Sequence, residues 1–146
     1  QRKSRQDFNN EVFYLGHTPA INKTLTAKEN LIWYCASRGL RNTNQIEIAL
    51  NNFNLHGYED MPCYLMSAGQ QRRVSLARML LSQAKLWILD EPFTALDKQG
   101  VLELEVLLSK HAKSGGSIIL TTHHSLKIDH LLQLIDLDSL VGLVST

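Results

Sequence analysis

The stretch from Leu86 to Pro92, LWILDEP, is a continuous apolar run that ends in two adjacent acids and a proline. Unbroken apolar runs of this kind are typical of strands that are covered on both faces, as in parallel sheets. Ligands bind at the carboxyl ends of such strands. We therefore expect Asp90 and Glu91 at a ligand-binding edge, where a bound cation would relieve their mutual repulsion. The alternative is that D-E-P merely ends a strand and begins a turn.

Two more apolar runs, Glu11–Leu15 (EVFYL) and Ser117–Thr122 (SIILTT), predict buried strands. Helical spacing and capping residues predict the helices between and after them. These helices are expected to run from Thr26 to Gly39, Asn44 to Phe53, Ser67 to Ser82, Asp97 to His111 and Leu126 to Leu134, with a short final strand after them. Strands that alternate with helices predict an α/β protein with a mostly parallel sheet. The helices that precede LWILDEP follow one another without strands, which predicts a helical insertion.

Composition excludes several classes of protein. The chain has 146 residues, of which 44% are hydrophobic and 20% charged, as expected for one globular domain. A net charge of +1 gives no electrostatic footprint for nucleic acid or an anionic membrane. Cys35 and Cys63 form no C-x-x-C, which argues against a disulfide scaffold or a zinc module. The chain starts with Gln1 and no signal-peptide pattern, so we expect either processing or a piece of something longer.

Ser67-Ala68-Gly69-Gln70 forms a capping box at the start of a predicted helix. Small residues there leave the first N–H groups of the helix accessible to an anion. Arg72 and Arg73 follow in the first turns, where the helix dipole disfavours cations. Their placement is easier to understand if an anion binds nearby. The alternative is a solvated basic turn beside an ordinary cap.

Two single residues complete the candidate set. Asp97, at the end of Thr94–Asp97, is expected to cap the next helix. His123 follows the Ser117–Thr122 strand, and a neutral imidazole there could donate to a phosphate and accept from water, although a lone histidine at a strand end is more often a surface residue. The neighbouring His124 and His130 suggest a metal site as an alternative. Strand geometry disfavours this alternative, because the adjacent side chains of His123 and His124 would point apart.

These motifs, in this order, resemble the nucleotide-binding domain of ATP-binding-cassette (ABC) proteins. MSAGQQRRVSLARMLL is similar to the signature segment, LWILDEP to the Walker B strand with its following glutamate, TALD to the D-loop, and IILTTH to the switch-histidine strand. FYLGHTPAINKTLTAKENLIWY, with SAGQQRRVSLAR and LTTHH, further resembles the ATP-binding subunits of cytochrome c maturation haem exporters. In that subfamily, as here, alanine (Ala68) replaces the first signature glycine, and a histidine (His17) stands at the Q-loop position. Together the similar segments run from about Glu11 to His124.

The resemblance implies a P-loop NTPase of the α/β class, an ABC nucleotide-binding domain with a mostly parallel sheet and an inserted helical subdomain. On this basis we assign residues 1–23 and 84–146 to a partial RecA-like core and 24–83 to the helical subdomain. A P-loop requires Gly-x-x-x-x-Gly-Lys-Ser/Thr, whose amides and lysine hold the phosphates, and this motif does not occur in the chain. We therefore expect the first strands and the P-loop to be missing, and the chain alone to be inactive.

The resemblance also implies ATP and Mg²⁺ as ligands and assigns roles in hydrolysis. Glu91 would polarise the attacking water, and His123 would contact the γ-phosphate. Asp90 would hold the Mg²⁺, and His17 would take the Q-loop role of sensing the metal or water. Phosphoryl transfer depends mostly on positioning and electrostatics, so each of these groups has to be held in place.

A second set of residues would act across a head-to-tail homodimer that sandwiches two ATP molecules. The signature residues Ser67, Ala68, Gly69 and Gln70 would contact the γ-phosphate of the partner's nucleotide, and Asp97 would span the interface. Closure of the dimer would drive integral membrane subunits. The chain would be a peripheral subunit at the cytoplasmic face of the inner membrane, with haem as an indirect substrate and no nucleic-acid partner.

Two other functions remain open at this point. The chain could be a truncated, non-catalytic product that only dimerises or binds a partner, and a test of ATP binding would separate this from the first hypothesis. It could also be a soluble ABC ATPase of DNA repair or translation. The single cassette, the near-neutral charge and the lack of a long coiled-coil insertion disfavour that third hypothesis.

Overall fold

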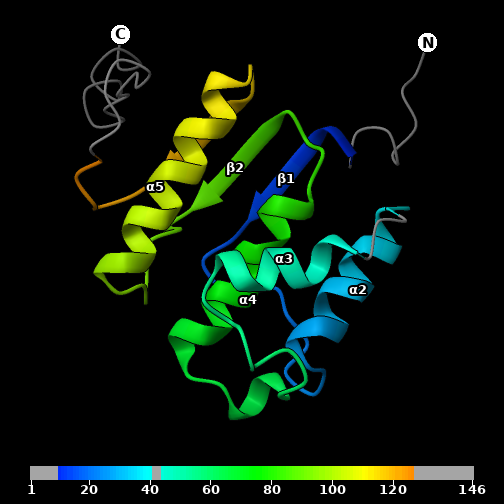
Figure 1. Cartoon of the computed structure of the whole chain (residues 1–146). Coiled ribbons are helices and arrows are strands. Elements are labelled where there is room, and N and C mark those ends of the chain that lie inside the picture. The colour runs from blue at the N-terminus through cyan, green and yellow to red at the C-terminus, as the bar shows by residue number, and fades with distance from the viewer. Residues whose placement is uncertain (1–9, 41–43, 127–146) are drawn as a thin grey trace, which may run out of the picture.

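The computed structural model describes residues 10–40 and 44–126 of the chain. Within this part, β1 (Val12–Leu15), β2 (Leu86–Asp90) and β3 (Ser117–Thr121) form one parallel sheet in the order β1-β2-β3 (Figure 1). The LWILDEP segment is therefore the central strand, and the predicted parallel α/β class is confirmed. The helix expected from Leu126 and the final strand fall largely on residues 127–146, outside the described residues.

The predicted helices between the first two strands are present. They are α2 (Ala27–Ser37), α3 (Gln45–Asn52) and α4 (Ala68–Leu81). A 3₁₀ turn that was not predicted, η1 (Cys63–Leu65), precedes α4. Helix α5 (Lys98–Lys113) connects β2 to β3. Figure 1 shows α2, α3 and α4 gathered beside the sheet, with α4 packed on β1 and α5 on β3. No helix in the described part of the chain is long and apolar enough to cross a membrane.

Side chains cap α2 and α4 at the positions that the sequence predicts. Thr26 accepts from the amide of Glu29 at 3.1 Å, and the Glu29 carboxylate accepts from the amide of Thr26 at 2.8 Å. Ser67 and Gln70 exchange the same pair of bonds at 3.2 and 2.9 Å. Each cap satisfies helix donors that have no partner within the helix, which stabilises the start of α2 and α4 by about 1 kcal/mol each.

The sheet is buried on one face. Phe13 and Leu15 of β1 and Trp87 and Leu89 of β2 point into the core, where side chains of α4 and α5 also lie. On the opposite face, Tyr14 and Ile119 are each 60% exposed. The expectation of strands covered on both faces is therefore wrong for the described residues. A run of apolar residues alone cannot show which face receives a partner, because both faces carry the same kind of side chain.

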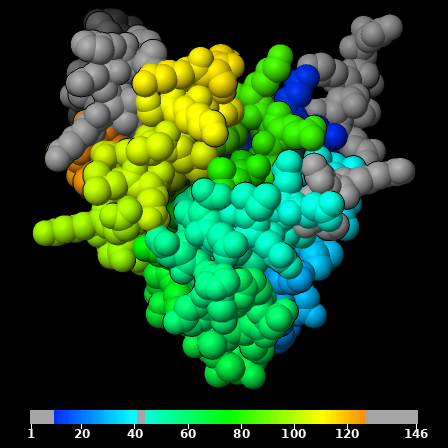
Figure 2. Space-filling view, in the orientation of Figure 1, coloured from blue at the N-terminus to red at the C-terminus, as the bar shows by residue number. Residues whose placement is uncertain are grey.

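The helical group has its own apolar packing, continuous with the sheet. Leu31 of α2, Leu50 of α3 and Leu76 of α4 are fully buried. Burial of each such side chain contributes about 2 kcal/mol. Asn54, just after α3, donates to Glu103 of α5 at 2.7 Å. Figure 2 shows the yellow-green surface of α5 next to the surface of the helical group.

The packing of α3 is tested by two substitutions on the same helix. Leu50→Ala should lower the free energy of unfolding by about 3 kcal/mol, because it leaves a cavity in a fully packed site. Ile48 is 60% exposed, so Ile48→Ala should change it by less than about 1 kcal/mol. Urea denaturation followed by circular dichroism measures both values. Equal losses for the two variants would contradict the described orientation of α3.

Candidate functional site

The carboxyl end of the central strand carries a strained turn. Asp90 is the last residue of β2, and Glu91 follows with a φ of 46°. A residue with a side chain pays about 1 kcal/mol or more in this left-handed region, and such outliers cluster at functional sites. The Glu91 amide donates to the carbonyl of Thr121 on β3 at 3.1 Å. The neighbouring strand thus holds the turn that displays the Glu91 carboxylate.

The structure brings Asp90, Glu91 and His123 together. The two acids end β2, and His123 lies just beyond the end of β3, which pairs with β2 in parallel. The imidazole Nε2 of His123 lies 3.5 Å from Oε1 of Glu91. The His123 side chain is fully exposed, so it can also reach a ligand over this edge. The predicted convergence of these three residues is what parallel pairing of the two strands produces.

The neighbouring His124 contacts a different pair of residues. Nε2 of His124 lies 3.5 Å from Oε1 of the buried Glu105, and its ring lies 5.0 Å from that of Phe93. Among the described residues, no group of three or more His, Cys, Asp or Glu side chains could hold a metal ion, and His130 lies outside them.

Arg72 is the residue whose role the sequence did not reveal. Its side chain is only 2% exposed. The guanidinium donates to five backbone carbonyls, at 2.7 to 3.4 Å: those of Gly16, His17, Asp90, Glu91 and Pro92. Burial lowers the pKa of Arg72, while the negative charges of Asp90 and Glu91 oppose that shift. The alternative of a solvated basic turn is therefore wrong for this side chain, which ties α4 to the ends of β1 and β2. An anion near this helix start stays a prediction.

His17 takes part in this arrangement through its backbone. Its carbonyl accepts from Arg72 at 3.3 Å, whereas its imidazole is exposed. Arg72 therefore links the backbone of His17 to the backbone of Asp90 and Glu91. The structure places the His17 backbone beside the acidic edge and leaves its ring free to turn toward a ligand.

The start of α4 lies at a separate, open depression of about 560 Å³. It is lined by Ser67, Gly69, Gln70, Arg73, Ala95 and Asp97, and does not include Asp90, Glu91 or His123. Ala68 begins α4 but is not among the lining residues. A Cβ atom on Gly69 would lie 2.9 Å from the carbonyl oxygen of Ala95, so the segments of α4 and of Ala95 approach as closely as glycine permits.

The chemistry at this helix start suits an anion. Ser67 Oγ accepts from the Gln70 amide, so its own hydrogen remains able to donate. The amides of Ala68 and Gly69 are the first of the helix and have no acceptor within it. Three donors are therefore available at this helix start, at the positive end of the helix dipole.

Arg73 also lines this depression, and its guanidinium already has three partners in the protein. It donates to the carboxylate of Asp97 at 2.6 Å, to Glu103 at 3.4 Å and to the carbonyl of Phe53 at 3.1 Å. The alternative of a solvated basic turn is wrong for Arg73, because this side chain is buried and pairs with the carboxylates of Asp97 and Glu103. Asp97 also caps α5 by accepting from the Gly100 amide at 2.9 Å, as predicted.

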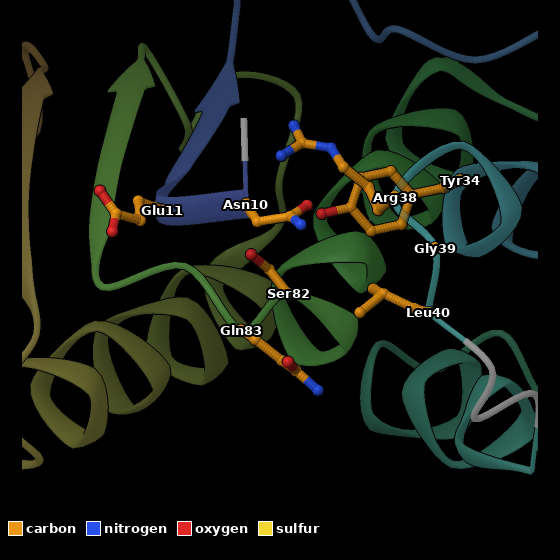
Figure 3. A pocket seen from close by; sticks show the side chains of 8 residues that line it. All are labelled: Asn10, Glu11, Tyr34, Arg38, Gly39, Leu40, Ser82 and Gln83. Carbon is orange, nitrogen blue, oxygen red and sulfur yellow. The ribbon is translucent and has the colours of Figure 1, made fainter. Parts of the chain in front are cut away.

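A second cavity, of about 500 Å³, lies at the amino end of β1 (Figure 3). Tyr34 and Arg38 of the α2 region, Asn10 and Glu11 before β1, and Ser82 after α4 are among its lining residues. None of the predicted site residues lines it. Ligands of parallel sheets bind at the opposite, carboxyl ends of the strands, so we place the candidate site there.

Residues 1–94 match the family described as ABC transporter. The chain belongs to this family. Among solved structures, it superposes on an ATP-binding subunit of an ABC transporter with a TM-score of 0.73 and 25% identity, over 81% of this chain and 50% of that one. It also superposes on a dimeric ATP-binding cassette in a post-hydrolysis state bound to ADP and Pi, with a TM-score of 0.72 and 20% identity, over 84% and 58% of the two chains. The predicted ABC fold is confirmed.

Two curated relatives of this chain are each named cytochrome c biogenesis ATP-binding export protein CcmA. The protein from Saccharophagus degradans is 48% identical over 134 residues, which cover 86% of this chain and 60% of the relative. The protein from Pseudomonas putida strain GB-1 is 53% identical over 116 residues, which cover 80% and 55%. The chain therefore spans little more than half the length of these relatives.

The charge of Asp97 gives a pH dependence that can be measured. The Gly100 amide, and then the positive charge of Arg73, lower the pKa of this carboxyl in the folded chain. Its contribution to stability is complete above the unfolded-state pKa of about 3.9 and is lost as the pH falls through the lower folded-state value. Asp97→Asn keeps a capping side chain but lacks the charge. The free energies of unfolding of the two proteins should differ most near neutral pH and converge in acid, and a constant difference would contradict this linkage.

Arg72 is tested by removing its donors while keeping its length. Arg72→Met should lower the free energy of unfolding by about 3 kcal/mol, because several buried carbonyls lose their partner together. Arg38→Met is a matched control: Arg38 donates to one carbonyl, that of Val12, and its loss should cost about 1 kcal/mol. Urea denaturation measures both. A smaller loss of unfolding free energy for Arg72→Met than for Arg38→Met would show that the contacts of Arg72 do not stabilise the fold.

Proposed function

We propose that this chain is the ATP-hydrolysing part of an ATP-binding subunit of a membrane ABC complex that exports haem for cytochrome c biogenesis. The observation that carries the proposal is the convergence of Asp90, Glu91 and His123 at the carboxyl edge of the sheet. Membership of the ABC family and relatives named for cytochrome c biogenesis and export support it.

In this proposal Glu91 and His123 act on the reacting groups. Glu91, held by its left-handed backbone, polarises the water that attacks the γ-phosphate. His123 donates to the γ-phosphate from the exposed side of the same edge, 3.5 Å from Glu91. Because the two side chains lie on neighbouring strand ends, a water and a phosphate bound at this edge can contact both of them.

Asp90 and His17 are the residues that would hold Mg²⁺. Oδ1 of Asp90 accepts from Thr121 at 2.8 Å, which leaves Oδ2 for a cation or for water bound to one. A single carboxylate fits Mg²⁺, since this ion keeps most of its ligands as waters and phosphate oxygens. Bound there, the ion would neutralise charge on the β- and γ-phosphates. His17 is carried beside this edge by its carbonyl bond to Arg72.

The signature residues support a role in dimers. We propose that Ser67, Ala68, Gly69 and Gln70 bind the γ-phosphate of ATP held by a second copy, through the Ser67 hydroxyl and the first amides of α4. Asp97 is 68% exposed, and both of its contacts use Oδ1, so the carboxylate can also meet a partner across the interface. The two separate sites of one chain then belong to two different nucleotides.

The partners and place of work follow from the same proposal. Dimer closure moves the helical subdomain, residues 24–83, and so drives integral membrane subunits. The chain then works at the cytoplasmic face of the inner membrane, with haem handled by the complex as a whole. No nucleic acid enters this scheme, in line with the net charge of +1.

Glu91→Gln tests the proposed reaction in the complete protein encoded by the reading frame that contains this chain. ATP turnover should fall about 100-fold or more, because the amide cannot polarise or accept a proton from water. ATP binding, followed by fluorescence of a labelled nucleotide, should be retained. Glu47→Gln on the surface of α3 is the matched control and should keep its turnover. Undiminished hydrolysis by Glu91→Gln would exclude the role given to this residue.

A further inference from the structure

Thr121, the last residue of β3, lies beside Asp90 in the sheet. The two residues are parallel partners in the β2–β3 register. The Thr121 hydroxyl donates to Oδ1 of Asp90 at 2.8 Å and accepts from the amide of Glu91 at 3.2 Å. The carbonyl of Thr121 accepts from the same amide at 3.1 Å. One residue therefore contacts both adjacent acids of the candidate site.

The direction of these hydrogen bonds is fixed by chemistry. An amide N–H can only donate, and an ionised carboxylate can only accept. The hydroxyl must therefore give its one hydrogen to Asp90 and its lone pair to Glu91. This arrangement fixes the rotation of the hydroxyl, restrains the Asp90 carboxylate and leaves its second oxygen, Oδ2, for another ligand.

The same residue supports the strained turn. Glu91 has a φ of 46°, a conformation that costs about 1 kcal/mol or more and needs support from its surroundings. Its amide is shared between the hydroxyl and the carbonyl of Thr121. Two residues further along the chain, His123 lies 3.5 Å from the Glu91 carboxylate. Thr121 is thus the point at which the positions of Asp90 and Glu91 are set relative to His123.

We propose that Thr121 is a positioning residue for ATP hydrolysis: its hydroxyl orients Asp90 toward the metal and holds the backbone of Glu91. This inference rests on the proposed function of the same edge. Thr121 does not itself touch nucleotide or metal in this scheme. A side chain of the same shape without the hydroxyl keeps the strand but loses the orientation of both acids.

Three variants of the complete protein encoded by this reading frame test the inference. Thr121→Val preserves the shape and the strand preference of the residue, and should lower kcat about tenfold while KM for ATP at saturating Mg²⁺ changes by less than about twofold. Thr121→Ser keeps the hydroxyl and should recover most of the wild-type kcat. Ser117→Ala removes an exposed hydroxyl at the other end of β3 and should leave turnover unchanged.

A metal-binding measurement separates orientation from general damage. The affinity for Mn²⁺ in the presence of ADP, followed by electron paramagnetic resonance, should fall about threefold to tenfold in Thr121→Val and return in Thr121→Ser. Equal thermal midpoints of the variants establish that the fold is intact. If Thr121→Val lowers both turnover and the thermal midpoint, Thr121→Ser decides between the two explanations. A Thr121→Ser protein that is as stable as wild type but as slow as Thr121→Val overturns the role of the hydroxyl.

The outcomes distinguish this inference from the function on which it rests. If Glu91→Gln is stalled while Thr121→Val keeps wild-type kcat and Mn²⁺ affinity, the positioning role of Thr121 is wrong and the proposed function stands. If Glu91→Gln hydrolyses ATP normally, the proposed function fails and the positioning role fails with it. A slow Thr121→Val with weakened Mn²⁺ binding, rescued by serine, supports both.

Discussion

The buried guanidinium of Arg72 is the interaction on which the arrangement of this chain depends. It is the point at which α4, the end of β1 and the end of β2 are joined through backbone carbonyls. Five acceptors around one cation compensate for its removal from water, which the side chain alone could not do. The helix that carries the signature residues is thus tied to the acidic edge by main-chain contacts that do not depend on the side chains of the residues contacted.

A second link, between Arg73 and Asp97, joins α4 to the start of α5. The two neighbouring arginines therefore point to different elements, one toward the sheet and one toward the next helix. With both in place, the first turn of α4 has little freedom to move independently of either. A ligand bound at the start of α4 would therefore be connected to the acidic edge through the first turn of α4 and the Arg72 side chain.

Much of this architecture could be predicted from the sequence. The capping residues Thr26, Ser67 and Asp97 and the apolar run before Asp90 were sufficient for the helices and the central strand, because these signals are local. The meeting of Glu91 with His123 followed from parallel pairing alone. These features depend on periodicity and on strand direction, which a single sequence displays.

The directions of Arg72, Arg73 and Thr121 could not be predicted in the same way. Each depends on which segment packs against it, and the acceptors are backbone carbonyls or residues 18 to 56 positions away, which leave no mark in the local pattern. The exposed sheet face that carries Tyr14 and Ile119 was not predicted either, because the local pattern does not mark it. Alternation of polar and apolar residues would have revealed it, and the runs VFYL, LWIL and IIL in these strands do not alternate.

The contact of Gly69 with the Ala95 carbonyl has a consequence for how the signature segment can change over evolution. Position 68 already carries a methyl group and does not line the depression, whereas a methyl group at position 69 would meet a backbone oxygen at 2.9 Å. Two adjacent small residues that look interchangeable in the sequence are thus under different steric constraints. A side chain at position 69 would require the loop of Ala95 to shift.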